Sequence, residues 1–272
     1  MKAHPLTIGE IDCTVLQDAE FSKTSEKLAE RYPTVSPAEI EAALDGAEAL
    51  DSINCLLINS GGTRILADVG FGGGWEATKG SLHSALNGIG VGLADIDIVY
   101  LTHFHGDHVA GLVVEEGRLE FSNARFMTTA AEWDEWMGRW AASDSPQDRK
   151  NLELFSSLQD RFTFVASGDE IAPGVSVVDL AGHTLGHTGL LVKSAGERLL
   201  HVVDLLHQAF QLQHLDWPFV FDSDPDLAAE TRRRTLQRCA DEGILTLFYH
   251  LPFPGLGTVA RDGAGYAFMP VS

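Results

Sequence analysis

Three histidines and one aspartate stand in six consecutive positions of this chain, in the sequence HFHGDH at residues 103–108. In an extended chain successive side chains point to opposite faces, so His103 and His105 point the same way. The glycine that follows allows a sharp turn, after which Asp107 and His108 present a second pair of polar side chains. Two pairs of ligands so close together favour a metal cluster over the alternative, a helix N-terminus capped by Asp107 beside incidental histidines.

Three more candidate ligands occur later in the chain, each at the end of an apolar, strand-like run. His183 follows the run VSVVDL, Asp204 ends LLHVVD and His250 ends ILTLFYH. Strand ends and the loops after them are where sheet proteins place their chemistry. Imidazoles and carboxylates without a thiolate suit zinc, manganese, iron or cobalt. Seven such groups exceed the ligands of one tetrahedral ion, so we expect two ions that share a carboxylate and ionise a bridging water near neutral pH.

The motifs HxHxDH and GHTxGH, a later aspartate and a final histidine, in this order, resemble the metallo-β-lactamase superfamily. The resemblance extends from residue 53 to the C-terminus. The resemblance implies that the protein binds two divalent metal ions, with zinc as the first choice of metal. It also implies which residue of each motif binds which ion. His103, His105 and His183 would hold the first metal, Asp107, His108 and His250 the second, and Asp204 would bridge them. His187 matches a histidine that in the family is usually not a ligand.

Four short segments narrow this resemblance to the methyl parathion hydrolase-like proteins, which stand beside the N-acyl homoserine lactonases. The segments are HLPFPGLG at 250–257, GYAFMPV at 265–271, DLLH at 204–207 and FDSD at 221–224. The subgroup implies a hydrolase that opens an ester-type bond, with a lactone as the first choice. One metal would polarise the carbonyl while the bridging hydroxide attacks it. Leu185 and Thr258 depart from residues common in the family, so the identity of the substrate does not transfer with the ligands.

Three other functions remain open. A phosphotriesterase or aryl esterase of the methyl parathion hydrolase type would use the same metal cluster on another neutral centre. A mononuclear iron dioxygenase that acts on persulfides belongs to the same superfamily. A non-catalytic metal-binding protein is disfavoured, because no ligand is missing from the motifs.

Aromatic residues near the ligand motifs are candidates for the walls of a substrate pocket. Phe71 and Trp75 lie in the glycine-rich segment GFGGGW after a predicted strand. Trp133, Trp136 and Trp140 recur at helical spacing, which indicates either core packing or an aromatic wall for an apolar group. The predicted substrate contacts are Phe71, Trp133, Trp136 and Phe253. The substrate would be a small neutral molecule with an apolar group.

Two polar residues are the candidate catalytic groups. Asp107 belongs to the ligand motif. His207 stands three residues after Asp204, where lactonases of the superfamily carry a tyrosine that contacts the substrate carbonyl. His207 would donate a hydrogen bond there or protonate a leaving group, unless it only packs behind the metals.

Composition limits the classes of function. The 272 residues include 19 basic and 39 acidic side chains, and the net charge of -20 repels phosphate backbones, so we expect no nucleic-acid substrate. The run RRR at 232–234 is interpreted as the solvated face of a helix. No stretch is long and apolar enough for a membrane span, and residues 1–10 lack the apolar core of a signal peptide. Three scattered cysteines favour the reducing cytoplasm. The sequence leaves open whether the chain forms a homodimer.

Strands and helices alternate along the chain, which by pattern alone indicates an α/β or α+β fold. Strands are predicted at 53–59, 63–69, 96–101, 125–129, 162–166, 175–180, 189–193, 199–204 and 245–250, and helices at 37–44, 130–142, 146–159 and 225–243. Because the ligands extend from position 103 to 250, we expect residues 1–272 to form a single domain. The superfamily resemblance implies a four-layer αββα sandwich, with one sheet before and one after about residue 165.

Overall fold

The computed structural model of this protein describes residues 2–72, 80–113 and 119–271. Trp75, one of the two aromatic candidates in the glycine-rich segment, lies outside these residues.

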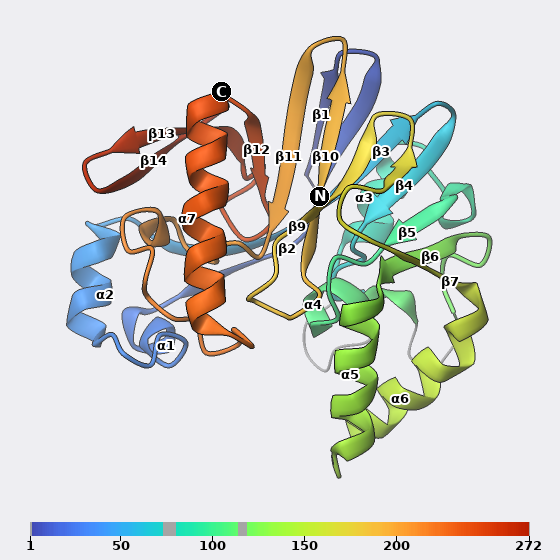
Figure 1. Ribbon diagram of the computed structural model, residues 1–272, viewed down its shortest axis with the longest axis horizontal. Coiled ribbons are helices and arrows are strands. Elements are labelled where there is room, and N and C mark those ends of the chain that lie inside the picture. Colours follow the sequence, from blue (N-terminus) through green and yellow to red (C-terminus); the bar gives the residue numbers. More distant parts are fainter. Residues whose placement is uncertain (1, 73–79, 114–118, 272) are drawn as a thin grey trace.

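Two seven-stranded sheets form the centre of the molecule (Figure 1). The first sheet contains, in spatial order, β1 (Ala3–Ile8), β2 (Ile11–Lys23), β3 (Ala49–Ser60), β4 (Thr63–Ala67), β5 (Ile98–Tyr100), β6 (Arg125–Thr129) and β7 (Phe162–Val165). Its strands pair antiparallel from β1 to β4 and parallel from β4 to β7. The carboxyl ends of β4, β5 and β6 therefore meet at one edge.

The second sheet comes entirely from the later part of the chain. Its spatial order is β14 (Gly265–Pro270), β13 (Leu256–Asp262), β12 (Leu245–Phe248), β11 (Glu197–Val203), β10 (Thr188–Ser194), β9 (Val175–Asp179) and β8 (Glu170–Ala172). Only β11 and β12 pair in parallel, and both lead into candidate ligands. The division between the sheets falls between residues 165 and 170, which confirms the boundary predicted from the sequence.

The apolar faces of the two sheets pack against each other. Val15, Ile58 and Tyr100 of the first sheet and Val177 and Leu190 of the second belong to one buried cluster. Strands that are apolar on both faces, such as β3 and β11, are covered by this cluster on one side and by helices on the other.

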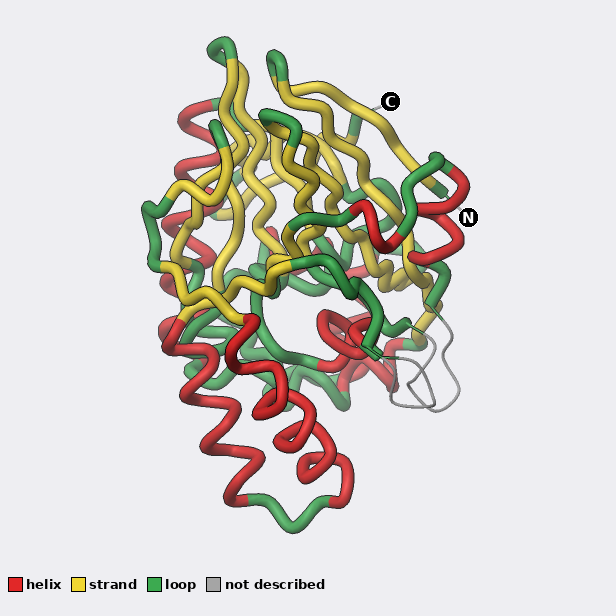
Figure 2. The backbone as a smooth tube through the Cα atoms, turned by 90° about the vertical axis from the view of Figure 1, so that its right-hand side faces the viewer, coloured by secondary structure: helices red, strands yellow, loops and turns green. Residues whose placement is uncertain are grey.

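Helices cover the outer faces of both sheets, so the order of layers is αββα, as predicted. The helices are α1 (Ser25–Ala29), α2 (Pro37–Leu44), α3 (Leu82–Gly88), α4 (Gly106–Val109), α5 (Ala130–Ala142), α6 (Pro146–Leu158) and α7 (Pro225–Glu242). Short 3-10 turns lie at Leu93–Asp95, Ala110–Leu112, Gln159–Arg161 and Ala209–Leu212. Figure 2 shows α5 and α6 as a hairpin that projects beyond the ends of the strands.

Local sequence signals set the ends of several helices. Ser36 and Glu39 form a capping box at the start of α2. The Asp224 side chain accepts a hydrogen bond from the Leu227 amide at the start of α7. The same helix ends at Gly243, whose φ of 60° is easily reached without a side chain.

The segment of α1 and α2 packs against the loops that follow β11. Tyr32 is buried there against Phe210 and Phe219, with ring centroids 5.1 and 5.4 Å away. The Tyr32 hydroxyl also donates a hydrogen bond to Gln211, 3.0 Å away. This contact fixes an early part of the chain beside the late candidate ligands.

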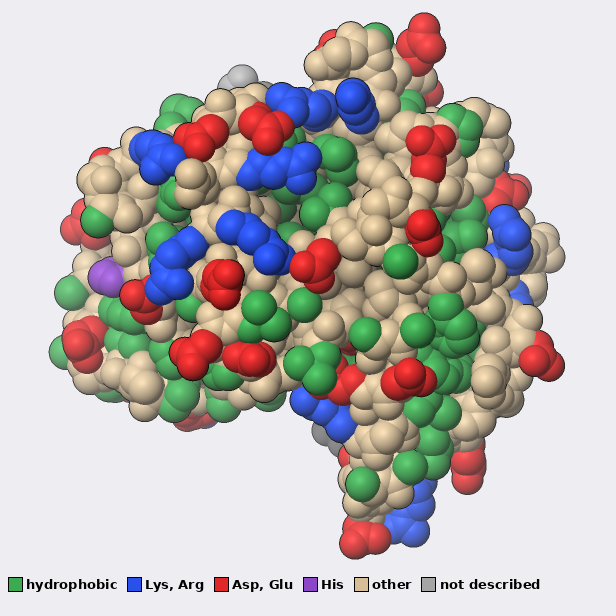
Figure 3. Space-filling model, viewed as in Figure 1, with side chains coloured by type: hydrophobic (Ala, Val, Ile, Leu, Met, Phe, Trp, Pro, Cys, Tyr) green, Lys and Arg blue, Asp and Glu red, His purple; other side chains and the backbone are tan. Residues whose placement is uncertain are grey.

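The outer surface carries interspersed charges, and Figure 3 shows acidic and basic side chains side by side on the face that bears α7. Arg233 and Arg234 pair with Asp216 and Asp179. Arg232 departs from the solvated face predicted for it, because it is buried and donates hydrogen bonds to backbone carbonyls in two loops. Among the described residues, no helix is both long and apolar enough to cross a bilayer.

Candidate metal centre

Three imidazoles converge at the ends of strands from both sheets. His103 and His105 follow β5, and His183 lies between β9 and β10. Nδ1 of His105 lies 3.0 Å from Nε2 of His103 and 2.9 Å from Nε2 of His183. One ring nitrogen has either one proton or one lone pair, so Nδ1 of His105 can make one good hydrogen bond and cannot satisfy both neighbours. A cation removes this conflict, and ligands of a tetrahedral zinc ion lie about 3.3 Å apart when each bond is about 2.0–2.1 Å.

Asp204 lies between this group and a second one. Its Oδ2 atom is 3.3 Å from Nε2 of His183 and 3.0 Å from Nε2 of His250, while Oδ1 is 3.2 Å from Nε2 of His108. The preceding residue, Val203, has a φ of 51°, and the pairing of β11 is irregular at that point. A β-branched residue rarely adopts positive φ, and such distortions commonly aim a side chain at a functional site.

The second group consists of Asp107, His108 and His250. Helix α4 begins at Gly106 and turns Asp107 and His108 toward the end of β12, where His250 lies. The Asp107 carboxylate is 3.7 Å from Nε2 of His250 and 3.8 Å from Nε2 of His108. Apart from their 3.2 Å contact with each other, Nε2 of His108 and Oδ1 of Asp204 are buried and have no hydrogen-bond partner among the described residues. Such atoms are the expected ligands of a cation, so the residues fit a metal here.

The structure thus brings all seven predicted ligands into one cluster. His187 lies close by, with its ring centroid 5.0 Å from that of His103. Its Nδ1 atom lies 3.0 Å from the Leu180 carbonyl, and His187 is absent from the groups whose ligand atoms converge.

Three buried or half-buried carboxylates orient the histidines from behind. Asp68 lies 2.8 Å from Nδ1 of His108 and Asp222 lies 2.9 Å from Nδ1 of His183. Nδ1 of His250 donates to the Ser52 carbonyl at 3.2 Å and lies 2.9 Å from the Asp51 carboxylate. A carboxylate only accepts, so each Nδ1 carries the proton and each Nε2 lone pair faces the cluster. Sequence reasoning did not assign these roles. The available signal was that Asp51, Asp68 and Asp222 stand beside predicted strands or quoted motifs.

Burial and charge shift the pKa values of the cluster in opposite directions. Burial holds the pKa values of His103 and His105 well below the ordinary range, so both present free lone pairs. Burial alone would also lower the pKa of His108, but the charges of Asp204 and Asp68 raise it to about 10. Burial would raise the pKa of Asp204, but the neighbouring histidines hold it well below its usual value. Protons therefore compete with a cation for His108, and metal affinity should fall in acid.

His207 also points into the cluster. Its Nε2 atom is 3.2 Å from Oδ2 of Asp204, and its ring stacks on Phe219 with centroids 3.6 Å apart. The backbone amide of His207 donates to the Gln211 side chain, at 2.6 Å. Gln211 is the residue that Tyr32 contacts, so the α1–α2 segment helps to position His207.

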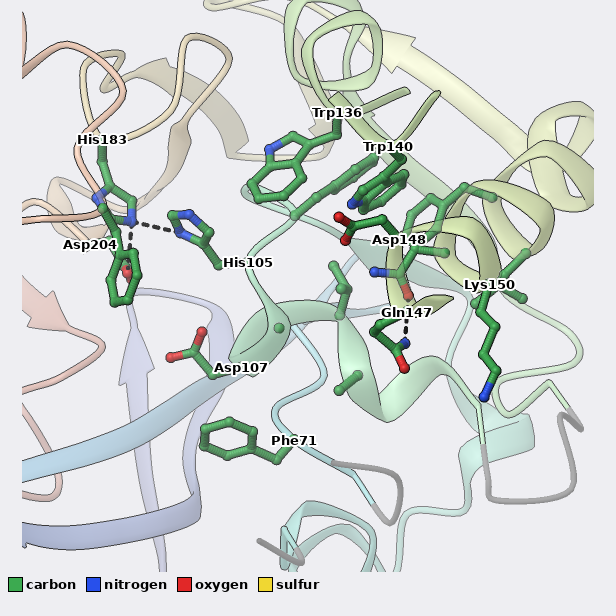
Figure 4. A pocket seen from close by; sticks show the side chains of 18 of the residues that line it. Phe71, His105, Asp107, Trp136, Trp140, Gln147, Asp148, Lys150, His183 and Asp204 are labelled. Atoms are coloured by element: carbon green, nitrogen blue, oxygen red, sulfur yellow. Dashed lines mark hydrogen bonds and ion pairs between the residues drawn. The ribbon is translucent and has the colours of Figure 1, made fainter. Parts of the chain in front are cut away.

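A cavity of about 980 Å³ opens onto the cluster and extends along α5 and α6 (Figure 4). Phe71 and Trp136, two of the predicted substrate contacts, line it, and the Trp136 ring lies 5.2 Å from that of His105. Two predicted contacts do not line the cavity. Trp133 is buried against Phe104, because it lies about 60° around α5 from Trp136, on the face that meets the core. Phe253 packs against the apolar cluster between the sheets.

Comparison with known proteins places this fold and site in a family. A model of the metallo-beta-lactamase superfamily matches residues 49–250. The chain therefore belongs to the metallo-β-lactamase superfamily.

Individual relatives were found by structure and by sequence. AidC, a dizinc quorum-quenching lactonase in complex with the product N-hexanoyl-L-homoserine, is 26% identical with a TM-score of 0.91, covering 99% of this chain and 97% of its own. The hydrolase AbOPH of the beta-lactamase superfamily is 26% identical with a TM-score of 0.86, at the same coverage of 99% and 97%. A probable metallo-hydrolase of Mycobacterium bovis is 26% identical over 203 residues, which are 65% of this chain. The match spans 61% of that curated relative, less than two thirds of its length.

Proposed function

We propose that this chain is a metal-dependent hydrolase that binds two divalent ions, with zinc as the first choice, and opens a lactone ring. The observation that carries the proposal is the position of Asp204, whose two oxygens face both groups of imidazoles. The proposed ligands are His103, His105 and His183 for one ion, Asp107, His108 and His250 for the other, and Asp204 for both. When bound, such a pair of ions polarises a carbonyl and lowers the pKa of a water molecule to near neutrality.

The side chains around the cluster have separate tasks. Asp107 has the more exposed carboxylate, with 23% of its side chain accessible against 3% for Asp204. We propose that Asp107 is the carboxylate that exchanges protons with the substrate. His207 is held by stacking and by its backbone, so its Nε2 atom can donate a hydrogen bond to the oxygen of the leaving group.

The cavity supports a neutral substrate with an apolar tail. Phe71, Trp136 and Phe221 provide aromatic surface beside the cluster, and Leu154 extends it along α6. An apolar wall with a few converging polar groups is typical of a small-molecule site. The likeness to AidC at 26% identity favours a lactone among the ester-type bonds. The net charge of -20 disfavours polyanions such as nucleic acid.

Elemental analysis combined with a substrate panel tests this proposal. The purified protein should contain close to two equivalents of zinc or a similar divalent ion. It should hydrolyse N-acyl homoserine lactones faster than aryl esters, phosphotriesters or phosphodiesters, and lose this activity when a chelator removes the metal. One equivalent of iron with oxygen uptake on a persulfide would instead identify a dioxygenase. A preference for phosphotriesters would identify the alternative hydrolase class.

A further inference from the structure

Arg31 continues the aromatic wall that begins at the metal cluster. It lines the cavity, and its guanidinium carbon lies 5.1 Å from the centre of the Phe221 ring. The Phe221 ring in turn lies 5.9 Å from the ring of His105. Arg31 is therefore separated from a proposed metal ligand by one aromatic side chain.

The backbone of Arg31 is fixed on both sides. Its amide donates to the Leu28 carbonyl at 2.7 Å, and its carbonyl accepts from the Val220 amide at 2.8 Å. The next residue, Tyr32, is fully buried and bound to Gln211. The anchored backbone and the contact with the Phe221 ring limit the positions that the guanidinium can reach.

Arg31 has a charge without a counterion in the described part of the chain, where no carboxylate oxygen lies within 4.0 Å of its guanidinium. Other arginines, such as Arg234 and Arg261, pair with aspartates on the surface. The neighbouring cation Lys23, whose pKa burial and then the charge of Arg31 lower to about 8, is not among the residues that line the cavity. Lys23 itself is paired with Asp51, which leaves Arg31 available to a ligand.

We propose that Arg31 determines substrate specificity by donating hydrogen bonds to an amide oxygen attached to the lactone ring. This inference rests on the proposed lactonase function. The planar guanidinium presents five N–H donors in a fixed fork, so it can donate two hydrogen bonds to one carbonyl oxygen. In an N-acyl lactone the amide lies between the reacting ring and the apolar tail. Phe221 lines the cavity beside His105, and Arg31 lines it on the other side of the Phe221 ring, so an amide next to a ring bound at the cluster would reach Arg31. Lys150, a second cation that lines the cavity, stands on α6, away from the labelled ligands in Figure 4.

A comparison of two lactones tests this role. N-hexanoyl homoserine lactone and a γ-butyrolactone with an alkyl chain of the same length differ in the amide. In Arg31→Met, the ratio of their kcat/KM values should fall about 10- to 100-fold, the effect of losing a hydrogen bond to a charged group. The kcat/KM for the alkyl lactone and the metal content should stay as in the wild type.

Two further variants complete the test. Arg31→Lys keeps the charge without the planar donors and should lower the same ratio by a smaller factor, and it decides the question should Arg31→Met not fold. Arg238→Met, a matched change at an exposed arginine paired with Glu242 on α7, should change neither lactone. Equal losses on both lactones, or an unchanged ratio in both Arg31 variants, would overturn the role of Arg31 alone. A wild type that opens neither lactone would refute the proposed function, and the role of Arg31 with it.

Discussion

Replacing Asp68 by asparagine should weaken the second proposed metal position and spare the first. Asp68 is fully buried and accepts three hydrogen bonds: from the Thr102 amide at 2.9 Å, from the Thr102 hydroxyl at 2.8 Å, and from Nδ1 of His108 at 2.8 Å. Its backbone has a φ of 61°, a conformation that asparagine tolerates. The substitution therefore changes the hydrogen bonding with little change of shape.

The asparagine amide group would face two donors. The Thr102 hydroxyl can adapt by rotating its O–H bond away from the new amide. Its oxygen has two lone pairs and can then accept from both the amide and His103. His108 can avoid the clash only by moving its proton to Nε2, the atom that faces Asp204. A lost hydrogen bond to a charged group costs about 1.5–3 kcal/mol, so one ion should bind about 10- to 100-fold more weakly.

Zinc titration of chelator-stripped protein, in competition with a chromogenic chelator, resolves the two affinities. Asp222→Asn is the matched control, because Asp222 accepts from Nδ1 of His183 in the first group. It should weaken the other ion by a similar factor, and circular dichroism should show that both variants fold. If both substitutions weakened the same ion, or if neither weakened any, the assignment of orienting carboxylates to separate metals would be refuted.

Four further predictions concern the cluster, the cavity and the core. Asp204→Ala should lower the metal content at both positions together; two equivalents retained in elemental analysis would show that it is not a shared ligand. His207→Ala should lower kcat more than it raises KM in steady-state kinetics, since help confined to the transition state appears in kcat, and a change in KM alone would contradict this. Trp136→Ala should raise KM for lactones with long tails, whereas Trp133→Ala should leave KM alone and cost about 3–5 kcal/mol in chemical denaturation; the opposite pattern would reverse their roles. Burial raises the pKa of Glu132 from 4.5 to about 7, so the folded state holds the proton more tightly than the unfolded state and stability should fall as pH rises through this interval. In metal-free protein, the free energy of unfolding should fall by up to about 3 kcal/mol across this pH interval, and Glu132→Gln should remove that fall. Parallel curves of stability against pH for the two proteins would count against the buried acid.

Local chemistry made part of this molecule predictable. The ligand types follow from what a divalent ion accepts, and the spacing within HFHGDH is short enough that the chain itself sets their positions. Strand β6 and helix α5 were predicted with the bounds that the structure shows, because the apolar pair Phe126 and Met127 leads into a threonine N-cap at Thr129. These signals act over a few residues and need no knowledge of the rest of the fold.

Long-range contacts hid other elements. Strand β2 was not predicted, because Gln17 and Asp18 interrupt its apolar pattern although both are buried. In the described part of the chain, the Asp18 carboxylate accepts hydrogen bonds from the distant amides of Phe71 and Leu82. Helical spacing likewise could not decide which tryptophan of α5 faces the cavity, since this depends on where Phe104 packs. The place of Arg31 in the cavity was not predicted either, because it depends on a contact with the distant Phe221.

The division of the chain at residues 166–169 has a consequence for stability. With the proposed ligands, the first ion takes His103 and His105 from one half and His183 from the other, while Asp204 of the later half serves both ions. The second ion likewise takes Asp107 and His108 from the earlier half and His250 from the later one. Neither half holds a complete set of ligands, so each ion would link the two sheets. This is in keeping with our proposal that residues 1–272 form one domain.

Binding of metal and docking of the halves are then a single linked equilibrium. An ion that binds only the docked state adds about 2.7 kcal/mol of stability when its free concentration is about 100 times its Kd. That increment is a substantial fraction of the stability of an ordinary domain, about 5–15 kcal/mol. We therefore expect the amount of intact protein in a cell to follow the supply of the metal, so that scarcity removes the enzyme by degradation as well as by inactivation.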